Sequence, residues 1–237
     1  MKRLPAALLV LFIVDFITDS FIAASYNNNF RYASKGLLMP LLLAFFIAGI
    51  KNGASSVDKK YIQPVCFALL FSFLGDVSLV KDGSLYFMLG IAAFLVAHIF
   101  YIILFCRIQP FTRNNSVFIL IRGAAIVGYV ALLDFLFWPK ITQQSLAIPV
   151  VTYSMVLGAM LFNALNLINK KGVPKKIITS LVFGAALFVL SDSIIAFNKF
   201  YLSTPVNGFY VMSTYCLAQF LIVNGATKFS NDYIHNN

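Results

Sequence analysis

The sequence predicts an all-α polytopic membrane protein: a single bundle of eight transmembrane helices with short loops and both termini cytoplasmic. Of its 237 residues, 60% are hydrophobic and 11% are charged, whereas a soluble domain carries about 25% charged residues. Eight apolar runs approach the roughly 20 residues that one membrane crossing requires. Spans of that length leave only short loops and tails, so we expect residues 1–237 to form a single integral-membrane helical domain.

The expected spans are residues 4–24, 36–50, 61–80, 85–106, 116–138, 146–168, 176–197 and 206–226. The first run begins after Lys2 and Arg3, as a secretion signal would, but Asp15 and Asp19 interrupt it and its length favours a span. A cleaved signal is therefore the less favoured alternative. The second run is the shortest and carries Pro40 near its expected start, a position that tolerates proline. Incomplete crossing by this run stays open.

Basic residues predict the orientation, because loops on the cytoplasmic side carry an excess of Lys and Arg. With the N-terminus inside, twelve basic residues fall inside, namely Lys2, Arg3, Lys51, Lys59, Lys60, Arg107, Arg113, Lys170, Lys171, Lys175, Lys176 and Lys228. Five fall outside, namely Arg31, Lys35, Lys81, Lys140 and Lys199. The net charge of +10 thus indicates contact with anionic membrane lipids rather than with nucleic acid. We expect a multi-pass protein of a bacterial-type inner (plasma) membrane.

The cysteines and the common catalytic motifs carry little information. Cys66, Cys106 and Cys216 lie in apolar runs at no metal-ligand spacing and resemble small core residues. The chain has no CxxC, HExxH, GxSxG, P-loop or GxGxxG motif. No metal and no cofactor is therefore predicted.

Two aspartates in apolar runs are the candidate catalytic residues. Asp76 follows Gly75 in Phe71–Val80, and Asp192 lies between two serines in Phe188–Phe197. A charged residue at the centre of a spanning helix costs about 2.5–3.5 kcal/mol on insertion scales, so such a residue usually has a function. Both lie toward the C-terminal ends of odd-numbered spans and hence at one level. We expect them to meet in one pocket that admits a lipid-like substrate; structural acids paired with helix hydroxyls are the alternative.

The expected surroundings of Asp76 and Asp192 suit acid–base chemistry. Burial disfavours the charged form of a carboxyl group, and a second carboxylate nearby acts in the same direction. We therefore expect one of the two to hold a proton near neutral pH. A pair with separated titrations is typical of hydrolysis by general acid and base. Because such a pair titrates as a unit, the sequence does not assign the acid.

Other polar residues in the spans are candidates for pocket and substrate contacts. His98 lies mid-span with Tyr101 one turn on, and Tyr215 and Gln219 are four residues apart and so share a helix face. For His98 the alternative is a hydrogen bond between helices. Tyr153, near a span end, has interface anchoring as its alternative.

Five segments together resemble a known family. They are KGLLMPLL at Lys35–Leu42, FSFLGDVSL at Phe71–Leu79, FMLGIAAFLVAHIFY at Phe87–Tyr101, LFVLSDSIIAFNKF at Leu187–Phe200 and STYCLAQFLI at Ser213–Ile222. In this order the chain resembles the YhhN-like family of membrane proteins, which includes the lysoplasmalogenases. One departure is Lys35-Gly36, where the family often has Lys-Pro.

The resemblance implies eight spans, an aspartate dyad formed by Asp76 and Asp192, and hydrolysis of the vinyl ether bond of a lysoplasmalogen to a fatty aldehyde and a glycerophospho-base. The expected substrate is thus a lysophospholipid, with Lys35, His98, Tyr153, Tyr215 and Gln219 as substrate-binding candidates. Lys35 is the expected phosphate partner. Two other functions stay open: a proton-coupled transporter of a lipid or small amphiphile, and a membrane scaffold with structural aspartates.

Overall fold

The computed structural model describes residues 3–24, 30–50, 56–110, 116–202 and 204–234, which form helices joined by short turns and contain no strand. The elements are α1 (Arg3–Ala24), α2 (Arg31–Gly49), α3 (Ser56–Ser78), α4 (Ser84–Ile108), α5 (Ser116–Gln143), α6 (Ala147–Asn166), the short η3 (Leu167–Asn169), α7 (Lys175–Phe200), α8 (Pro205–Lys228) and η4 (Phe229–Ile234). All eight α-helices of the described residues are long and apolar enough to cross a membrane. The predicted all-α polytopic fold is confirmed.

The start of α2 differs from the prediction. The helix begins at Arg31 rather than at residue 36, so Arg31 and Lys35 lie within it. Its 19 residues extend about 28 Å at 1.5 Å per residue, close to the thickness of the hydrocarbon core. Pro40 consequently lies in the helix interior, where its missing N–H leaves the carbonyl of Gly36 without its helical donor.

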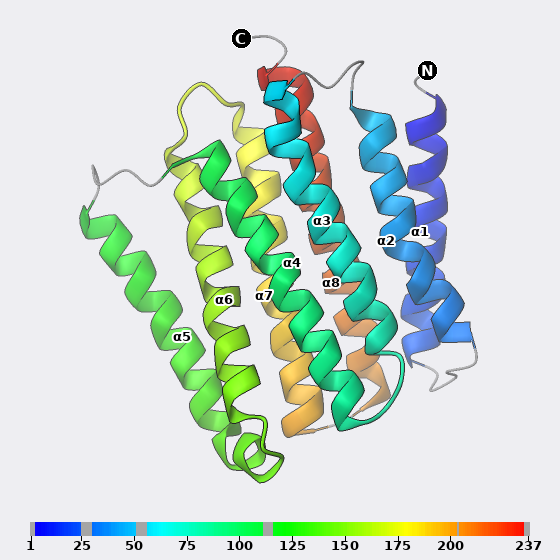
Figure 1. Ribbon diagram of the computed structural model, residues 1–237, viewed down its shortest axis with the longest axis vertical. Helices are drawn as coiled ribbons and strands as arrows, with labels where there is room; N and C mark the ends of the chain where they lie inside the picture. The colour runs from blue at the N-terminus through cyan, green and yellow to red at the C-terminus, as the bar shows by residue number, and fades with distance from the viewer. Residues whose placement is uncertain (1–2, 25–29, 51–55, 111–115, 203, 235–237) are drawn as a thin grey trace.

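The helices form an antiparallel bundle in which α1 begins and α8 ends at the same end (Figure 1). The odd-numbered helices therefore share a direction, and their C-terminal halves lie together at the opposite end. Asp76 and Asp192 are both in such halves, which agrees with their predicted common level, and so are Asp19 and Asp134. The largest helix pairings are α7 with α8 and α3 with α4, while α5 packs mainly on α6 at the edge (Figure 1).

Close helix packing fixes the position of Asp76. Gly75 faces α4, where a Cβ atom would lie only 2.6 Å from the ring of Phe94. The absence of a side chain at Gly75 thus allows α3 to lie against this ring, and Asp76 follows directly. The pair of α7 and α8 relies on a similar contact, because a Cβ at Gly184 would lie 2.9 Å from the carbonyl oxygen of Ala218.

Candidate active site

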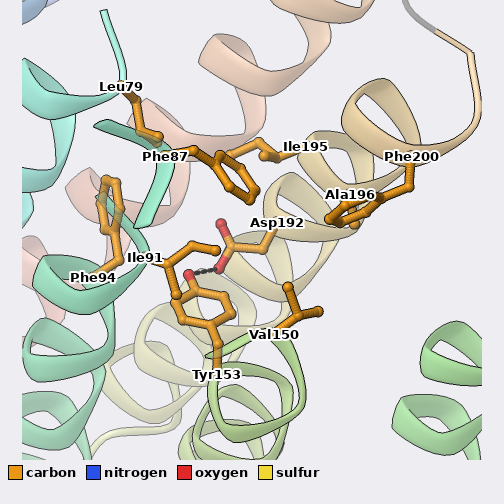
Figure 2. Close-up of a pocket in the computed structure, with 10 residues that line it drawn as sticks. All are labelled: Leu79, Phe87, Ile91, Phe94, Val150, Tyr153, Asp192, Ile195, Ala196 and Phe200. Carbon is orange, nitrogen blue, oxygen red and sulfur yellow. Dashed lines mark hydrogen bonds between the residues drawn. The ribbon is translucent and has the colours of Figure 1, made fainter. Parts of the chain in front are cut away.

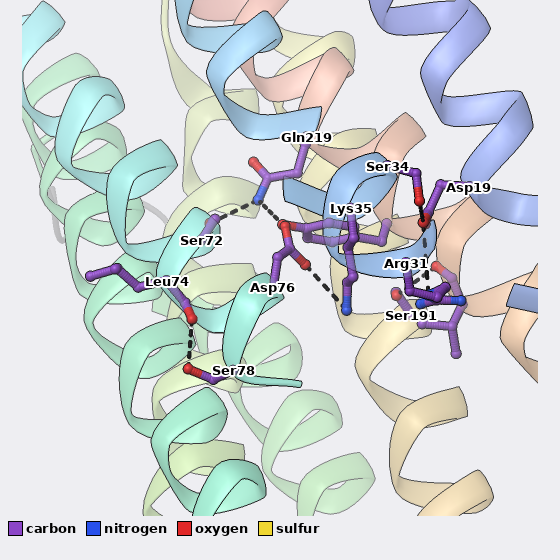
Figure 3. Close-up of polar contacts among 12 residues, drawn as sticks. Asp19, Arg31, Ser34, Lys35, Ser72, Leu74, Asp76, Ser78, Ser191 and Gln219 are labelled. Carbon is purple, nitrogen blue, oxygen red and sulfur yellow. Dashed lines mark hydrogen bonds and ion pairs between the residues drawn. The ribbon is translucent and has the colours of Figure 1, made fainter. Parts of the chain in front are cut away.

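Asp76 is buried, and both of its carboxylate oxygens have donors. Its side chain is 1% exposed, and Oδ1 lies 3.4 Å from Nζ of Lys35 on α2 (Figure 3). Oδ2 accepts a hydrogen bond of 2.7 Å from the hydroxyl of Tyr215 on α8. An ammonium group and a phenol that donate to a carboxyl group favour its ionised form, whereas burial acts against that form. Asp76 therefore joins α2, α3 and α8 through two polar contacts.

A hydrogen-bond network extends from Tyr215 across the bundle. Tyr101 on α4 donates to Oε1 of Gln219, and Nε2 of Gln219 donates to Oγ of Ser72 over 2.9 Å. The same Nε2 lies 3.4 Å from the hydroxyl of Tyr215. The predicted shared face of Tyr215 and Gln219 is confirmed, and it turns toward Asp76. Both ends of the buried amide have partners, as an apolar environment requires.

Asp192 has a different environment. Its Oδ2 accepts a 2.5 Å hydrogen bond from the hydroxyl of Tyr153 on α6 and lies 3.3 Å from Nε2 of His98 on α4. Its Oδ1 has no polar partner among the described residues. Figure 2 shows one carboxylate oxygen bonded to Tyr153 and the other directed away from it, toward Phe87. Asp192 thus presents one unengaged oxygen.

The backbone of α4 sets the tautomer of His98. Nδ1 lies 2.6 Å from the carbonyl oxygen of Phe94, and a carbonyl can only accept, so Nδ1 carries a hydrogen. A neutral imidazole then directs the lone pair of Nε2 at the Asp192 carboxylate, where two lone pairs would repel. Nε2 is buried and makes no hydrogen bond among the described residues. A proton on either atom would turn the 3.3 Å contact into a hydrogen bond.

The unengaged side of Asp192 borders a small apolar cavity. Its volume is about 60 Å³, and a cavity needs roughly 10–15 Å³ measured in this way to hold one water. The cavity is lined by Leu79, Phe87, Ile91, Phe94, Val150, Tyr153, Asp192, Ile195, Ala196 and Phe200 (Figure 2). It has space for water or for the reacting end of a chain next to a carboxyl group.

A larger polar cavity adjoins it at the end of the bundle away from the two termini. Its volume is about 550 Å³, and Leu79, Phe87 and Ile195 line both cavities. We call this larger cavity the vestibule. It is lined by Ala23, Arg31, Lys35, Leu79, Val80, Lys81, Asp82, Gly83, Phe87, Ile195, Asn198, Lys199, Gly208, Val211 and Met212. The polar vestibule thus lies next to the apolar cavity that Asp192 lines.

Aromatic rings connect the surroundings of the two aspartates. Phe188 lies with ring centroids 5.5 Å from Tyr215 and 4.7 Å from His98. Phe94 lies 5.8 Å from Tyr215 and also lines the apolar cavity. Of the predicted site residues, the structure therefore groups His98 and Tyr153 with Asp192, and Lys35, Tyr215 and Gln219 with Asp76. That the two aspartates share one pocket stays a prediction.

Sequence reasoning missed the contacts of Arg31, which it counted as a loop charge. Arg31 Nε lies 3.7 Å from Oδ1 of Asp19, and Oγ of Ser34 donates to the same oxygen over 2.7 Å. The signal was present, because Arg31 precedes Lys35 by one helical turn and shares its face if α2 begins early. Tyr101 was noted only as a neighbour of His98, although a spacing of three residues places both side chains on the same face of α4.

Comparison with known proteins agrees with these observations. The YhhN family matches residues 30–226. The mouse protein named lysoplasmalogenase TMEM86B is 31% identical over 190 residues, which is 79% of this chain and 72% of the mouse protein. The Mycobacterium tuberculosis protein named lysoplasmalogenase is 30% identical over 174 residues, 71% of this chain and 60% of that protein. No solved structure matches this chain. Since the match covers most of the sequence and includes both aspartates and the helices that contact them, the chain belongs to the YhhN family.

Proposed function

We propose that this chain is an intramembrane lysoplasmalogenase, which hydrolyses the vinyl ether bond of a lysoplasmalogen to a fatty aldehyde and a glycerophospho-base. The relatives named above support the reaction. The observation that carries the proposal is the unengaged oxygen of Asp192, which borders an apolar cavity that shares lining residues with a polar vestibule. A single-chain lipid with a charged head has these two parts, and its vinyl ether lies at the boundary between them.

The proposed reaction begins with proton transfer to carbon. Asp192, protonated on the unengaged Oδ1, gives this proton to the β-carbon of the vinyl ether and leaves an oxocarbenium ion. Water then adds to the α-carbon and returns one proton to the carboxylate, which gives a hemiacetal. The hemiacetal collapses to the aldehyde and the free glycerol hydroxyl, so one water is consumed and the acid is regenerated. Glycosidases use paired carboxyl groups around a similar cation.

Asp76 is the ionised member of the proposed dyad. Its contacts with Lys35 and Tyr215 maintain a negative charge in a medium of low dielectric, where a charge acts over longer distances than in water. That charge favours the oxocarbenium ion over the neutral substrate. Tyr153 holds Asp192 in place by donating to Oδ2, which leaves Oδ1 for the substrate.

The charge distribution also supports an orientation. When the N-terminus is assigned to the inside, the sequence places twelve basic residues in inside segments and five in outside segments. We propose that the end at which α1 begins is cytoplasmic. The vestibule then opens on the opposite side of the membrane.

Aldehyde release tests this function. The purified protein in detergent is given a 1-alkenyl lysophospholipid and, separately, the saturated 1-alkyl ether of the same chain length, which has no double bond to protonate. We expect aldehyde from the first alone, and a loss of turnover in both Asp76→Asn and Asp192→Asn. Asp134→Asn is the matched control. Asp134 accepts a hydrogen bond from Ser154 and lies outside the residue groups around Asp76 and Asp192, so this variant should retain activity.

The other candidate functions give different results in the same preparation. A lipid transporter would release no aldehyde but would move labelled lipid across a liposome membrane. A scaffold would do neither. Aldehyde release that survives in both Asp76→Asn and Asp192→Asn would show that the site is wrong.

A further inference from the structure

Basic side chains outnumber acidic ones in the lining of the vestibule. Arg31, Lys35, Lys81 and Lys199 line it, and among its described lining residues Asp82 is the only acid. These cations come from α2, the α3–α4 connection and α7, so the fold gathers them from distant parts of the sequence. Their field at the mouth of the cavity favours an anionic ligand.

Buried or aromatic contacts hold each of these cations in position. Arg31 is held at Nε by Asp19, which is itself fully buried (Figure 3). Nζ of Lys199 lies 4.7 Å from the ring centroid of Phe87. A guanidinium has five N–H donors, so one carboxylate at Nε leaves further donors for a ligand. An anion that binds the remaining N–H groups of Arg31 would therefore not displace Asp19.

Lys35 connects the vestibule with the surroundings of Asp76. Its side chain is 8% exposed, it lines the vestibule, and its Nζ lies 3.4 Å from Asp76. This distance exceeds the 2.7–2.9 Å of a good charge-assisted hydrogen bond. An ammonium group has three donors, and an anion in the vestibule would compete with Asp76 for them. A ligand in the vestibule can therefore change the charge balance at Asp76.

We propose that the vestibule is a phosphate-binding subsite, in which Arg31 and Lys35 bind the phosphate of the lysophospholipid head group. This inference rests on the proposed function and adds to it the part of the substrate that is recognised. Phosphate oxygens suit the planar donors of Arg31 and the point charge of Lys35. Binding also draws Lys35 away from Asp76, and the less compensated carboxylate then stabilises the oxocarbenium ion more strongly.

The residues that line the vestibule offer few groups that could bind the amine of the head group. A quaternary ammonium is usually bound by aromatic faces or carboxylates, and Phe87 in the vestibule already contacts Lys199. Phosphocholine and unsubstituted phosphate head groups should therefore bind within about fivefold of one another. Loss of the phosphate removes charge-assisted bonds worth about tenfold to a hundredfold each.

Binding of non-hydrolysable ethers tests the subsite without requiring turnover. Dissociation constants are measured for 1-alkyl-glycerophosphocholine, 1-alkyl-glycerophosphate and 1-alkylglycerol of one chain length, and for inorganic phosphate alone. We expect the two phospholipids to bind about a hundredfold more tightly than 1-alkylglycerol, and inorganic phosphate to bind far more weakly than either. Equal binding of 1-alkylglycerol would overturn the proposal. Inorganic phosphate binding as tightly as the phospholipids would assign the vestibule to a free anion instead.

Variants identify the residues responsible. Arg31→Gln and Lys35→Gln should each reduce the preference for phospholipid over 1-alkylglycerol by tenfold or more. Because Arg31→Gln leaves the buried carboxylate of Asp19 without its cation, the double variant Asp19→Asn/Arg31→Gln is measured beside it as a more stable background. Lys140→Gln, an exposed lysine of α5 that does not line the vestibule, should keep the full preference. A preference retained in both vestibule variants would contradict the assignment.

Turnover separates this inference from the function on which it rests. With 1-alkenyl substrates, absence of the phosphate should lower kcat as well as raise KM, since Lys35 then stays on Asp76. Aldehyde from all substrates at the same kcat/KM would support the hydrolase function and contradict the phosphate subsite. Phosphate-dependent binding of the alkyl ethers without aldehyde from any substrate would contradict the hydrolase function and support the phosphate subsite.

Discussion

Asp76 and Asp192 occupy similar places in the sequence but differ in their freedom to react. Each lies near the C-terminal end of an odd-numbered helix, yet both oxygens of Asp76 have donors, whereas Asp192 keeps one oxygen toward a cavity. A carboxyl group with donors on both oxygens leaves neither oxygen free for a substrate. A carboxyl group with one unengaged oxygen at a cavity can exchange a proton with a substrate. We propose that these different neighbours, rather than depth in the membrane, give the two acids different roles.

The largest expected effect comes from removing each carboxyl group and supplying a small acid in solution. Asp192→Ala should lower aldehyde release by about 10²–10⁴-fold, the usual contribution of general acid–base catalysis. Formate should restore part of this activity, because a cavity already borders the lost group. Asp76→Ala should also lose activity, and formate should not restore it. Rescue of Asp76→Ala alone would reverse the two roles.

The next effect concerns stability at the Lys35–Asp76 pair. Removing one partner of a buried ion pair leaves an uncompensated charge and costs about 3–5 kcal/mol, whereas replacing both costs much less. Asp76→Asn and Lys35→Gln should thus each lower the free energy of unfolding in detergent by that amount. The double variant should be more stable than either single variant. Additive losses would mean that the 3.4 Å contact contributes no coupling.

A smaller effect distinguishes the two tyrosines. A hydrogen bond to a charged group contributes about 1.5–3 kcal/mol. Tyr153→Phe removes the donor that holds Asp192 and should lower kcat about tenfold to a hundredfold with little change in melting temperature. Tyr215→Phe, at Asp76, should instead mainly lower the melting temperature. Equal losses of kcat in the two variants would place both hydroxyls at the reaction.

The smallest effect tests the close packing that positions Asp76. In Gly75→Ala the new methyl group would meet the ring of Phe94 at 2.6 Å, and such overpacking costs about 1–3 kcal/mol. Gly128→Ala in α5 is the control, since a Cβ there meets nothing within 4 Å and alanine favours a helix by about 1 kcal/mol over glycine. Unfolding free energies of the two variants should therefore change in opposite directions. A neutral Gly75→Ala would show that the ring of Phe94 can move without cost.

The helices can be predicted from the sequence, because a membrane span requires a minimum length of apolar residues. The start of α2 could not be predicted in this way, because composition alone assigns Arg31 and Lys35 to a loop. In the structure these two residues pair with buried carboxylates of α1 and α3. Partners from other helices decide whether a charged residue can lie inside a span.

In the candidate site, too, the sequence predicts some features, while others depend on contacts between helices. Asp76 and Asp192 stood out because an isolated acid in an apolar run is costly. Which oxygen of Asp192 is unengaged depends on Tyr153 and on the tautomer of His98, and these contacts join α4, α6 and α7. Spacing within one helix does not contain that information.

Deuterium incorporation tests the central claim, that an acid of the site delivers a proton to carbon. The purified protein hydrolyses a 1-alkenyl lysophospholipid in D₂O, and the aldehyde is trapped at once and analysed by mass spectrometry, with the free aldehyde incubated alongside as a blank. The account predicts one deuterium on the carbon next to the aldehyde carbonyl, because the β-carbon takes its new hydrogen from an exchangeable acid. Aldehyde without deuterium at that carbon would contradict it.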